Sequence, residues 1–250
     1  MKKFLPLILL LVGVVVVVVV FFVVKGKKDA VEPEDEETAL LNVVLADRPV
    51  VSLTPSEDGH YLNLKVEKIV INAESVDYEL LYKNTEGTTL GVPGMQNLDG
   101  IDSFEAELLL GSESSGKFRY DEGVEEGSMT LRFRNSEGKL LAKFESEFRL
   151  FSETSELSSS DGKFKMVLSN DTKDFYVVMH SVGVPDDFPN SHDDILVGPY
   201  GVFASDLVDN VESFEVTEGS TFGFFNDKWT NELPSDFDSG IFLGTKSPIS

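Results

Sequence analysis

An uninterrupted apolar segment near the N-terminus constrains this chain more than any other feature. Phe4 to Val24 contains no charged or hydrogen-bonding side chain. As a helix rising ~1.5 Å per residue it would extend about 31 Å, which matches the ~30 Å hydrocarbon thickness of a bilayer. In lipid a lone span must be helical, because only a helix satisfies all of its backbone N–H and C=O groups internally. The segment therefore predicts a transmembrane helix.

A cleavable signal peptide is the alternative interpretation of this segment. The apolar run exceeds the usual length of about 7 to 15 residues, and no small-residue cleavage pattern follows it. We therefore expect an uncleaved anchor over residues 1–28, with lysines on both flanks. These flanks nearly cancel in charge, but a short basic N-terminus before an apolar run is typical of an export signal. The prediction is a single-pass protein with a cytoplasmic N-terminus and extracytoplasmic domains.

Acidic residues dominate the chain beyond this anchor. All 44 acidic residues follow position 28, whereas five of the 21 basic residues precede position 29, which leaves a net charge of −28 on the remainder. Such a charge excludes a general affinity for nucleic acid or for anionic lipid surfaces. The absence of cysteine from the sequence excludes disulfides, thiolate metal sites and cysteine nucleophiles. Residues 29–48 start with six acidic residues in ten positions, and their mutual repulsion predicts an extended stalk.

From Pro49 onward the dominant sequence period is two residues. Apolar and polar residues alternate over 62–66, 76–82, 104–110, 129–133 and 140–150. This alternation is typical of strands with one packed face and one solvated face. Turn sequences separate the segments at Asp58-Gly59, Gly91 to Gly94 and Asn135 to Gly138. The fold is therefore predicted to be all-β, a sandwich of short antiparallel strands, with a hairpin around Asn135 to Gly138.

Residues 152–157 are polar, serine-rich and without periodicity, and we interpret them as a linker. The segments on either side, 49–151 and 158–250, share landmarks in the same order. Asp58-Gly59, Gly91-Val92-Pro93 and VEEGSMTLRF from Val124 recur as Asp161-Gly162, Gly183-Val184-Pro185 and VTEGSTFGFF from Val216. We therefore predict two tandem copies of one β-sandwich module. The alternative is that two unrelated sandwiches have similar turn sequences between their strands.

The size, alternation and turn spacing of this module resemble the immunoglobulin-like and fibronectin type III superfold of membrane-anchored bacterial surface proteins. The resemblance is architectural and covers both modules. The Cys…Trp…Cys signature of true immunoglobulin domains is absent, because the chain has no cysteine and Trp229 falls in a late predicted loop. The resemblance implies antiparallel sandwiches but no particular activity.

No catalytic motif is present in the sequence. It contains no G-x-S-x-G, no H-E-x-x-H, no phosphate-binding loop and no dinucleotide-binding glycine pattern. His180 and Ser181 are adjacent, which places their side chains on opposite faces of a strand. Paired carboxylates are expected on the solvated faces of so acidic a chain, and no glycosidase-type pair stands out. We therefore predict a protein without enzymatic activity.

Two acidic loops are candidate calcium sites. Their carboxylates belong to Asp186, Asp187, Asp193 and Asp194 in one loop, and to Asp236 and Asp238 in the other. Together with backbone carbonyls they could supply the roughly six to eight oxygen ligands that Ca²⁺ takes. The second loop departs from EF-hand spacing, since Ser247 stands where a bidentate Glu is required. An exposed acidic connection is the alternative for both loops, and no other cofactor is expected.

Three aromatic residues fall in predicted loops of the second module, namely Phe188, Trp229 and Phe237. A loop aromatic can anchor a partner protein or a glycan. It can also plug the open end of a sandwich, which the acidic neighbours of Phe237 favour for that residue.

These features predict a membrane-anchored envelope protein that presents two β-sandwich modules for binding, adhesion or scaffolding. The second module is expected to make the contacts. One alternative is an accessory subunit of a membrane-embedded secretion or pilus-type assembly, in which the helix packs against partners. Another is a Ca²⁺-stabilised structural repeat protein.

Overall fold

A computed structural model describes residues 40–171, 173–232 and 236–248 of this protein. The chain from Leu41 onward forms one compact unit. The predicted transmembrane helix, both of its basic flanks and most of the predicted stalk lie outside the described residues. Within the described part, no helix has the length and apolarity needed to cross a bilayer.

Strands and two short 3-10 helices make up the regular structure of the described residues. The first half, residues 41–151, contains η1 (Leu45–Asp47), β1 (Val50–Pro55), β2 (Tyr61–Glu67), β3 (Ser75–Lys83), β4 (Thr89–Asn97), β5 (Phe104–Leu109), β6 (Gly111–Ser114), β7 (Lys117–Tyr120), β8 (Glu126–Arg134) and β9 (Leu140–Phe151). The second half, residues 152–248, contains β10 (Glu156–Ser158), β11 (Phe164–Leu168), β12 (Tyr176–His180), η2 (His192–Asp194), β13 (Ile195–Val208), β14 (Val211–Val216), β15 (Ser220–Phe225), β16 (Lys228–Thr230) and β17 (Phe237–Thr245). The prediction of an all-β fold is confirmed.

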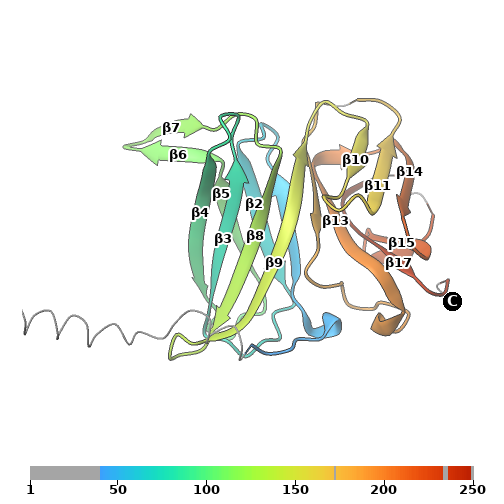
Figure 1. The fold of residues 1–250 in the computed structure, drawn as a ribbon, viewed down its shortest axis with the longest axis horizontal. Helices are drawn as coiled ribbons and strands as arrows, with labels where there is room; N and C mark the ends of the chain where they lie inside the picture. The colour runs from blue at the N-terminus through green and yellow to red at the C-terminus, as the bar shows by residue number, and fades with distance from the viewer. Residues whose placement is uncertain (1–39, 172, 233–235, 249–250) are drawn as a thin grey trace, which may run out of the picture. The chain divides into compact units, whose positions relative to one another are not determined.

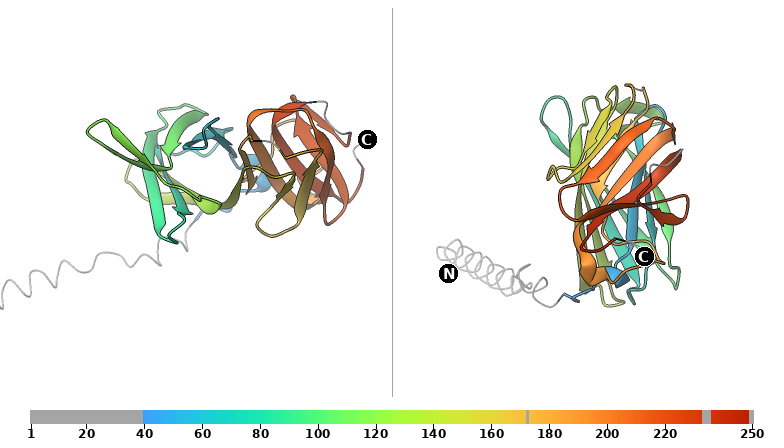
Figure 2. Two further views of the ribbon diagram at one scale, coloured as in Figure 1. Left: turned by 90° about the horizontal axis from the view of Figure 1, so that it is seen from above. Right: turned by 90° about the vertical axis from the view of Figure 1, so that its right-hand side faces the viewer.

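One large antiparallel sheet passes through both halves. Its strand order is β16-β15-β17-β13-β12-β9-β8-β3-β4, and two three-stranded sheets, β1-β2-β5 and β10-β11-β14, accompany it. The two halves join where β9 pairs with β12, with Phe151 opposite Tyr176 and Phe148 opposite Met179. Figures 1 and 2 show this sheet running from the green strands into the orange ones.

The two small sheets cover opposite faces of the large sheet. Val177 and Met179 of β12 belong to the buried cluster under β1 and β2, whereas Tyr176 and Val178 belong to the cluster under β11. Successive side chains of a strand point to opposite faces, so the two clusters lie on opposite sides of β12. Figure 1 accordingly draws β2 and β5 behind the large sheet, and β10 and β11 in front of it.

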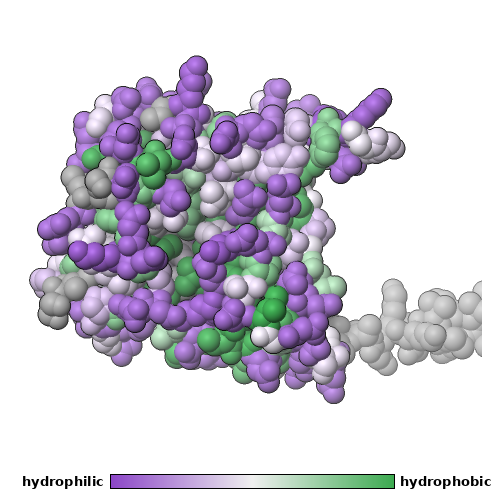
Figure 3. All heavy atoms as spheres, turned by 180° about the vertical axis from the view of Figure 1, so that it is seen from behind, coloured by the Kyte–Doolittle hydropathy of each residue, from purple (hydrophilic) through white to green (hydrophobic). Residues whose placement is uncertain are grey.

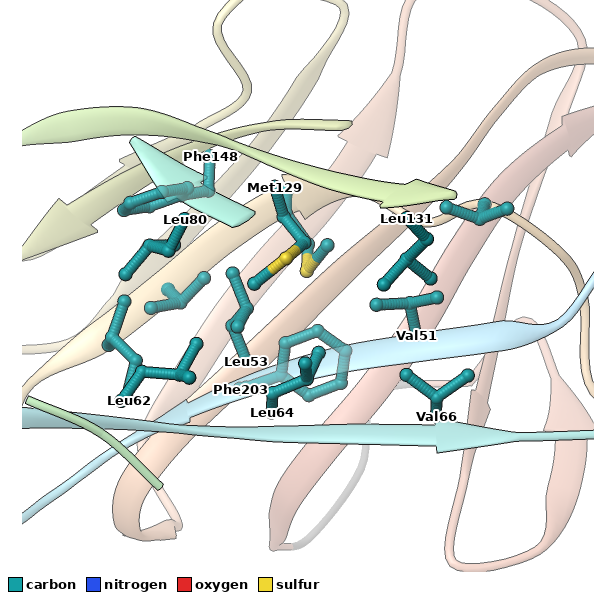
Figure 4. Close-up of a cluster of buried hydrophobic side chains, with 14 of the residues drawn as sticks. Val51, Leu53, Leu62, Leu64, Val66, Leu80, Met129, Leu131, Phe148 and Phe203 are labelled. Carbon is teal, nitrogen blue, oxygen red and sulfur yellow. The ribbon is translucent and has the colours of Figure 1, made fainter. Parts of the chain in front are cut away.

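This arrangement differs from the predicted pair of separately cored modules. Phe203 of β13 is 3% exposed and belongs to the first half's buried cluster, where it lies beside Leu53 and Leu64 (Figure 4). Ile241 of β17 joins the same cluster. The difference arises because β9 extends as far as Phe151 and offers its free edge to β12. The predicted linker 152–157 therefore ends inside β10, and the large sheet continues across it from β9 to β12.

One predicted turn is a strand. Gly91 to Gly94 lies in the middle of β4, which pairs only with β3 among the described strands. Leu98 N–H donates to Glu74 O and Asn84 N–H to Thr88 O, so the intervening pair Glu79 and Pro93 falls on a non-hydrogen-bonded step of the ladder. The proline nitrogen then faces the free edge, which is the position that an edge strand tolerates.

The predicted duplication agrees with the small sheets but not with the large one. The first two strands of each half are joined by the same turn, in which a serine hydroxyl donates to an aspartate two residues later: Ser56 to Asp58 and Ser159 to Asp161, both at 2.6 Å. Each turn lies within a small sheet, and the two small sheets, β1-β2-β5 and β10-β11-β14, have the same connectivity. In the large sheet, however, β3 pairs with β4 and β8, while β12 pairs with β13 and with β9 of the other half. The duplication stays a prediction.

The turn of the second half carries a testable pH dependence. Partial burial acts to raise the pKa of Asp161, but hydrogen bonds from the Ser159 hydroxyl, the Lys163 amide and the Tyr200 hydroxyl outweigh it and lower this pKa to about 2. A depressed folded-state pKa stabilises the protein above the unfolded pKa of about 4, and this contribution is lost as the pH falls toward 2.

We expect Asp161→Asn to lower the free energy of unfolding by about 1 kcal/mol at neutral pH, after discounting for solvent screening. The difference from the unchanged protein should vanish near pH 2. Urea unfolding at several pH values measures it. The matched control is Asp58→Asn in the other turn, which lacks a tyrosine donor and should have the smaller effect. A pH-independent difference would contradict the assignment.

Candidate functional site

The structure places the three predicted contact aromatics differently. Phe188 and Trp229 come together, with ring centroids 5.0 Å apart, and His192 lies 5.4 Å from Phe188. Both aromatics are half-buried against a small apolar cluster of the second half. Phe237 is not accessible to a partner. It is the first residue of β17, is 1% exposed, and packs against Phe225 and Phe242. Its burial agrees with the alternative prediction, in which Phe237 plugs the sandwich.

The six candidate calcium ligands do not assemble into a site. Asp186 forms an ion pair with Lys68 at 2.7 Å, while the backbone carbonyls of Asp193 and Asp194 accept hydrogen bonds from Lys246. Among the described residues, no three His, Cys, Asp or Glu side chains gather where they could hold a metal ion. The exposed acidic connection is the interpretation that this geometry favours.

A different surface gathers exposed aromatic side chains, on the hairpin formed by β6 and β7. This hairpin projects from the first half (Figure 1). Its two central residues, Ser115 and Gly116, have φ of 54° and 75°, which is the pattern of a tight two-residue hairpin turn. At its base Gly111 lies opposite Tyr120, and a Cβ on Gly111 would stand 2.2 Å from the Arg119 carbonyl oxygen. Glycine is therefore required where the two strands approach closely.

The hairpin presents a row of rings that we call the aromatic surface, made of Phe118, Tyr120, His60 and Tyr61. Phe118 and Tyr120 share one face of β7 because they are two residues apart, and they are 49% and 38% exposed. Their rings are nearly parallel, with centroids 6.2 Å apart. The His60 ring stacks on Tyr120 at 3.8 Å, and Tyr61 meets Tyr120 edge-on at 6.3 Å. The aromatic surface thus extends from β2 onto the projecting hairpin.

Hydrogen bonds fix both ends of this surface. The carboxylate of Asp58 lies 3.0 Å from His60 Nδ1, and hydrogen bonds from Ser56 and from the His60 amide lower the pKa of Asp58. After the hairpin, Asp121 accepts a hydrogen bond of 2.9 Å from the buried Tyr82 hydroxyl. Burial, and then this bond, raise the pKa of Tyr82, so the phenol stays a neutral donor. The hairpin therefore leaves the sandwich from an anchored base.

The aromatic surface lies at the end of the first half that is remote from the point where the chain enters it. Leu41 N–H donates to Leu141 O, next to the turn between β8 and β9. The hairpin base is bonded to the opposite end, where Leu110 N–H donates to His60 O. Strand β8 separates the two ends by about 27 Å, at ~3.3 Å per residue. Within residues 41–250, the aromatic surface and Leu41 thus lie at opposite ends of the first half.

Phe118 and Tyr120 are not among the contact residues predicted from the sequence, although a signal for them is present. The segment from Gly111 to Tyr120 contains a Ser-Gly turn followed by Lys-Phe-Arg-Tyr, a strict alternation of basic and aromatic residues. That pattern predicts a short hairpin with aromatic residues on one face. The two strands of this hairpin have only four residues each, too few for a clear alternation pattern to stand out.

Neither protein-family models, nor characterised proteins, nor solved structures give a match to this chain. The chemistry of the aromatic surface therefore rests on its own geometry. It holds exposed rings and polar rims, which are features of a binding surface.

Proposed function

We propose that this protein is a non-enzymatic binding protein, held in a cell envelope by its N-terminal apolar segment. Its two β-sandwich halves face away from the cytoplasm and present binding surfaces to partners. The observation that carries the proposal is the aromatic surface of Phe118, Tyr120, His60 and Tyr61 at the end remote from Leu41. The immunoglobulin-like character of the halves and the tandem arrangement belong to the same proposal.

Physical properties of aromatic side chains support a contact role for this hairpin. Phenylalanine and tyrosine bury a large area while losing little conformational freedom, which is why they dominate the energy of many interfaces. Monomeric proteins rarely leave such rings exposed in a contiguous row. The large net negative charge of the chain favours solubility in spite of these exposed rings.

Site-directed cross-linking tests this proposal in membranes from cells that express the full chain. A photo-cross-linking amino acid replaces Arg119, which points away from the rings and leaves Phe118 and Tyr120 intact. The control position is Glu137, an exposed residue of the turn near Leu41. We expect a discrete adduct from position 119 and none from position 137. Equal adducts from both positions, or no adduct from position 119, would overturn the proposal.

A further inference from the structure

A second surface, which we call the interhalf groove, runs between the two halves on the face that carries β1 and β2. It is a hollow of about 1160 Å³. The first half's small sheet covers only part of this face of the large sheet, and the ends of β13, β15 and β17 remain uncovered beside it. Figure 3, which looks at this side of the molecule, shows hydrophobic residues at the bottom of a hollow surrounded by hydrophilic ones.

The bottom of the groove is apolar. Phe203 and Ile241 form it from below with exposures of 3% and 4%, and Phe224 lies half-buried beside them. Leu207, on the rim, is 56% exposed and is the apolar side chain of the groove most accessible to a partner. A ligand that places an apolar group here would remove Leu207 from water.

The rim of the groove carries an uncompensated negative charge. Two lysines line it, and both are already engaged: Lys65 with Glu67 at 2.9 Å, and Lys68 with Asp186 at 2.7 Å. The remaining carboxylates belong to Asp102, Asp206, Asp227 and Asp238. Within the part of the chain that the structure describes, none of these four forms an ion pair with a basic side chain. A cationic ligand is thus the complement of this rim.

We propose that the interhalf groove binds an extended cationic segment of a partner protein, with an apolar residue between lysine or arginine side chains. This inference rests on the proposed binding role but uses a surface separate from the hairpin. At about 1160 Å³ the groove is as large as the largest typical small-molecule pockets, about 1,000 Å³, and so has room for a short chain segment. A second copy of this chain fits poorly, because each copy brings a net charge of −23.

Fluorescence anisotropy of the full chain in mild detergent tests the proposal with three short labelled peptides. The first alternates lysine with valine, the second replaces lysine by glutamate, and the third replaces valine by serine. We expect saturable binding of the first peptide alone. Raising the salt from about 0.1 M to about 1 M shortens the Debye length from ~10 to ~3 Å and should weaken binding on the order of tenfold. Binding of the lysine-serine peptide with equal affinity would overturn the requirement for an apolar residue.

Matched variants separate the groove from overall charge. Asp206→Asn with Asp238→Asn should weaken binding of the lysine-valine peptide on the order of tenfold. Glu86→Gln with Glu137→Gln removes the same charge from exposed turns outside the groove and should leave the affinity unchanged. Equal weakening by both pairs would overturn the proposal. Self-association abolished by Leu207→Ser would instead assign the groove to a second copy and would also overturn it.

The peptide-binding results do not depend on the hairpin. Absence of an adduct from position 119 would overturn the proposed contact of the aromatic surface but would not affect peptide binding to the groove. Loss of peptide binding would overturn the groove proposal alone.

Discussion

Replacing Phe118 and Tyr120 together by alanine is expected to reduce partner capture on the order of 30-fold, with little effect on folding. Truncating an exposed aromatic contact in an interface costs about 1 to 2 kcal/mol, and these two rings form the centre of the aromatic surface. The yield of adduct from position 119, measured as a function of protein concentration in membranes, gives the change. Because both rings are partly exposed, the unfolding free energy should fall by less than about 1 kcal/mol.

The matched control for this pair is Met95→Ala. Met95 is an exposed apolar residue of the first half that is not aromatic. It is 59% exposed on the edge strand β4 and lies outside the aromatic surface. It should leave the adduct yield unchanged. If the adduct yield is unchanged by the loss of both rings, or falls equally with Met95→Ala, the hairpin does not form the proposed contact with the partner.

Phe203→Ala is expected to lower the free energy of unfolding by about 3 to 5 kcal/mol, the usual range for truncating a buried phenylalanine. Phe203 comes from β13 of the second half, yet its ring packs under β1 and β2 of the first half (Figure 4). Its removal leaves a cavity in a core that both halves share. Hydrogen exchange of the β8 amides, which belong to the first half, should therefore accelerate as strongly as that of the β13 amides.

Leu207→Ala serves as the control for Phe203→Ala. It lies four residues further along the same strand and is 56% exposed, so the unfolding free energy should change by less than about 1 kcal/mol. If Phe203→Ala accelerates exchange in the second half and leaves β8 protected, the two halves have independent cores. The claim that they share a core would then be wrong.

Local sequence patterns predicted the strands well, because alternation is a property of a few consecutive residues. The predicted hairpin around Asn135 to Gly138 appears as β8 and β9. The continuity of the large sheet was missed, since the pairing of β9 with β12 joins two segments across the predicted linker. A signal existed in the run Tyr176 to Met179, which is apolar at every position. Such a run is typical of a strand that is buried on both faces.

The candidate site was harder to predict than the fold. The sequence leaves open whether the three loop aromatics contact a partner or plug the sandwich; in the structure Phe237 lies in a core, and Phe188 and Trp229 pack on each other. The packing of a loop depends on which sheet face is left uncovered, and that face is set by the long-range order of the strands. The aromatic surface likewise depends on His60 of one turn meeting Tyr120 of a distant hairpin, with no trace in local sequence.

The interhalf groove depends on residues 41–250 being one body. The interhalf groove takes its lining from both halves, and Phe203 belongs to the core beneath the strands that lead to the aromatic hairpin. Differential scanning calorimetry of residues 41–250, which form one compact unit, tests this most directly. We predict a single transition whose calorimetric enthalpy equals its van't Hoff enthalpy. Two transitions, or a calorimetric enthalpy about twice the van't Hoff value, would show two independently folding modules and contradict the account.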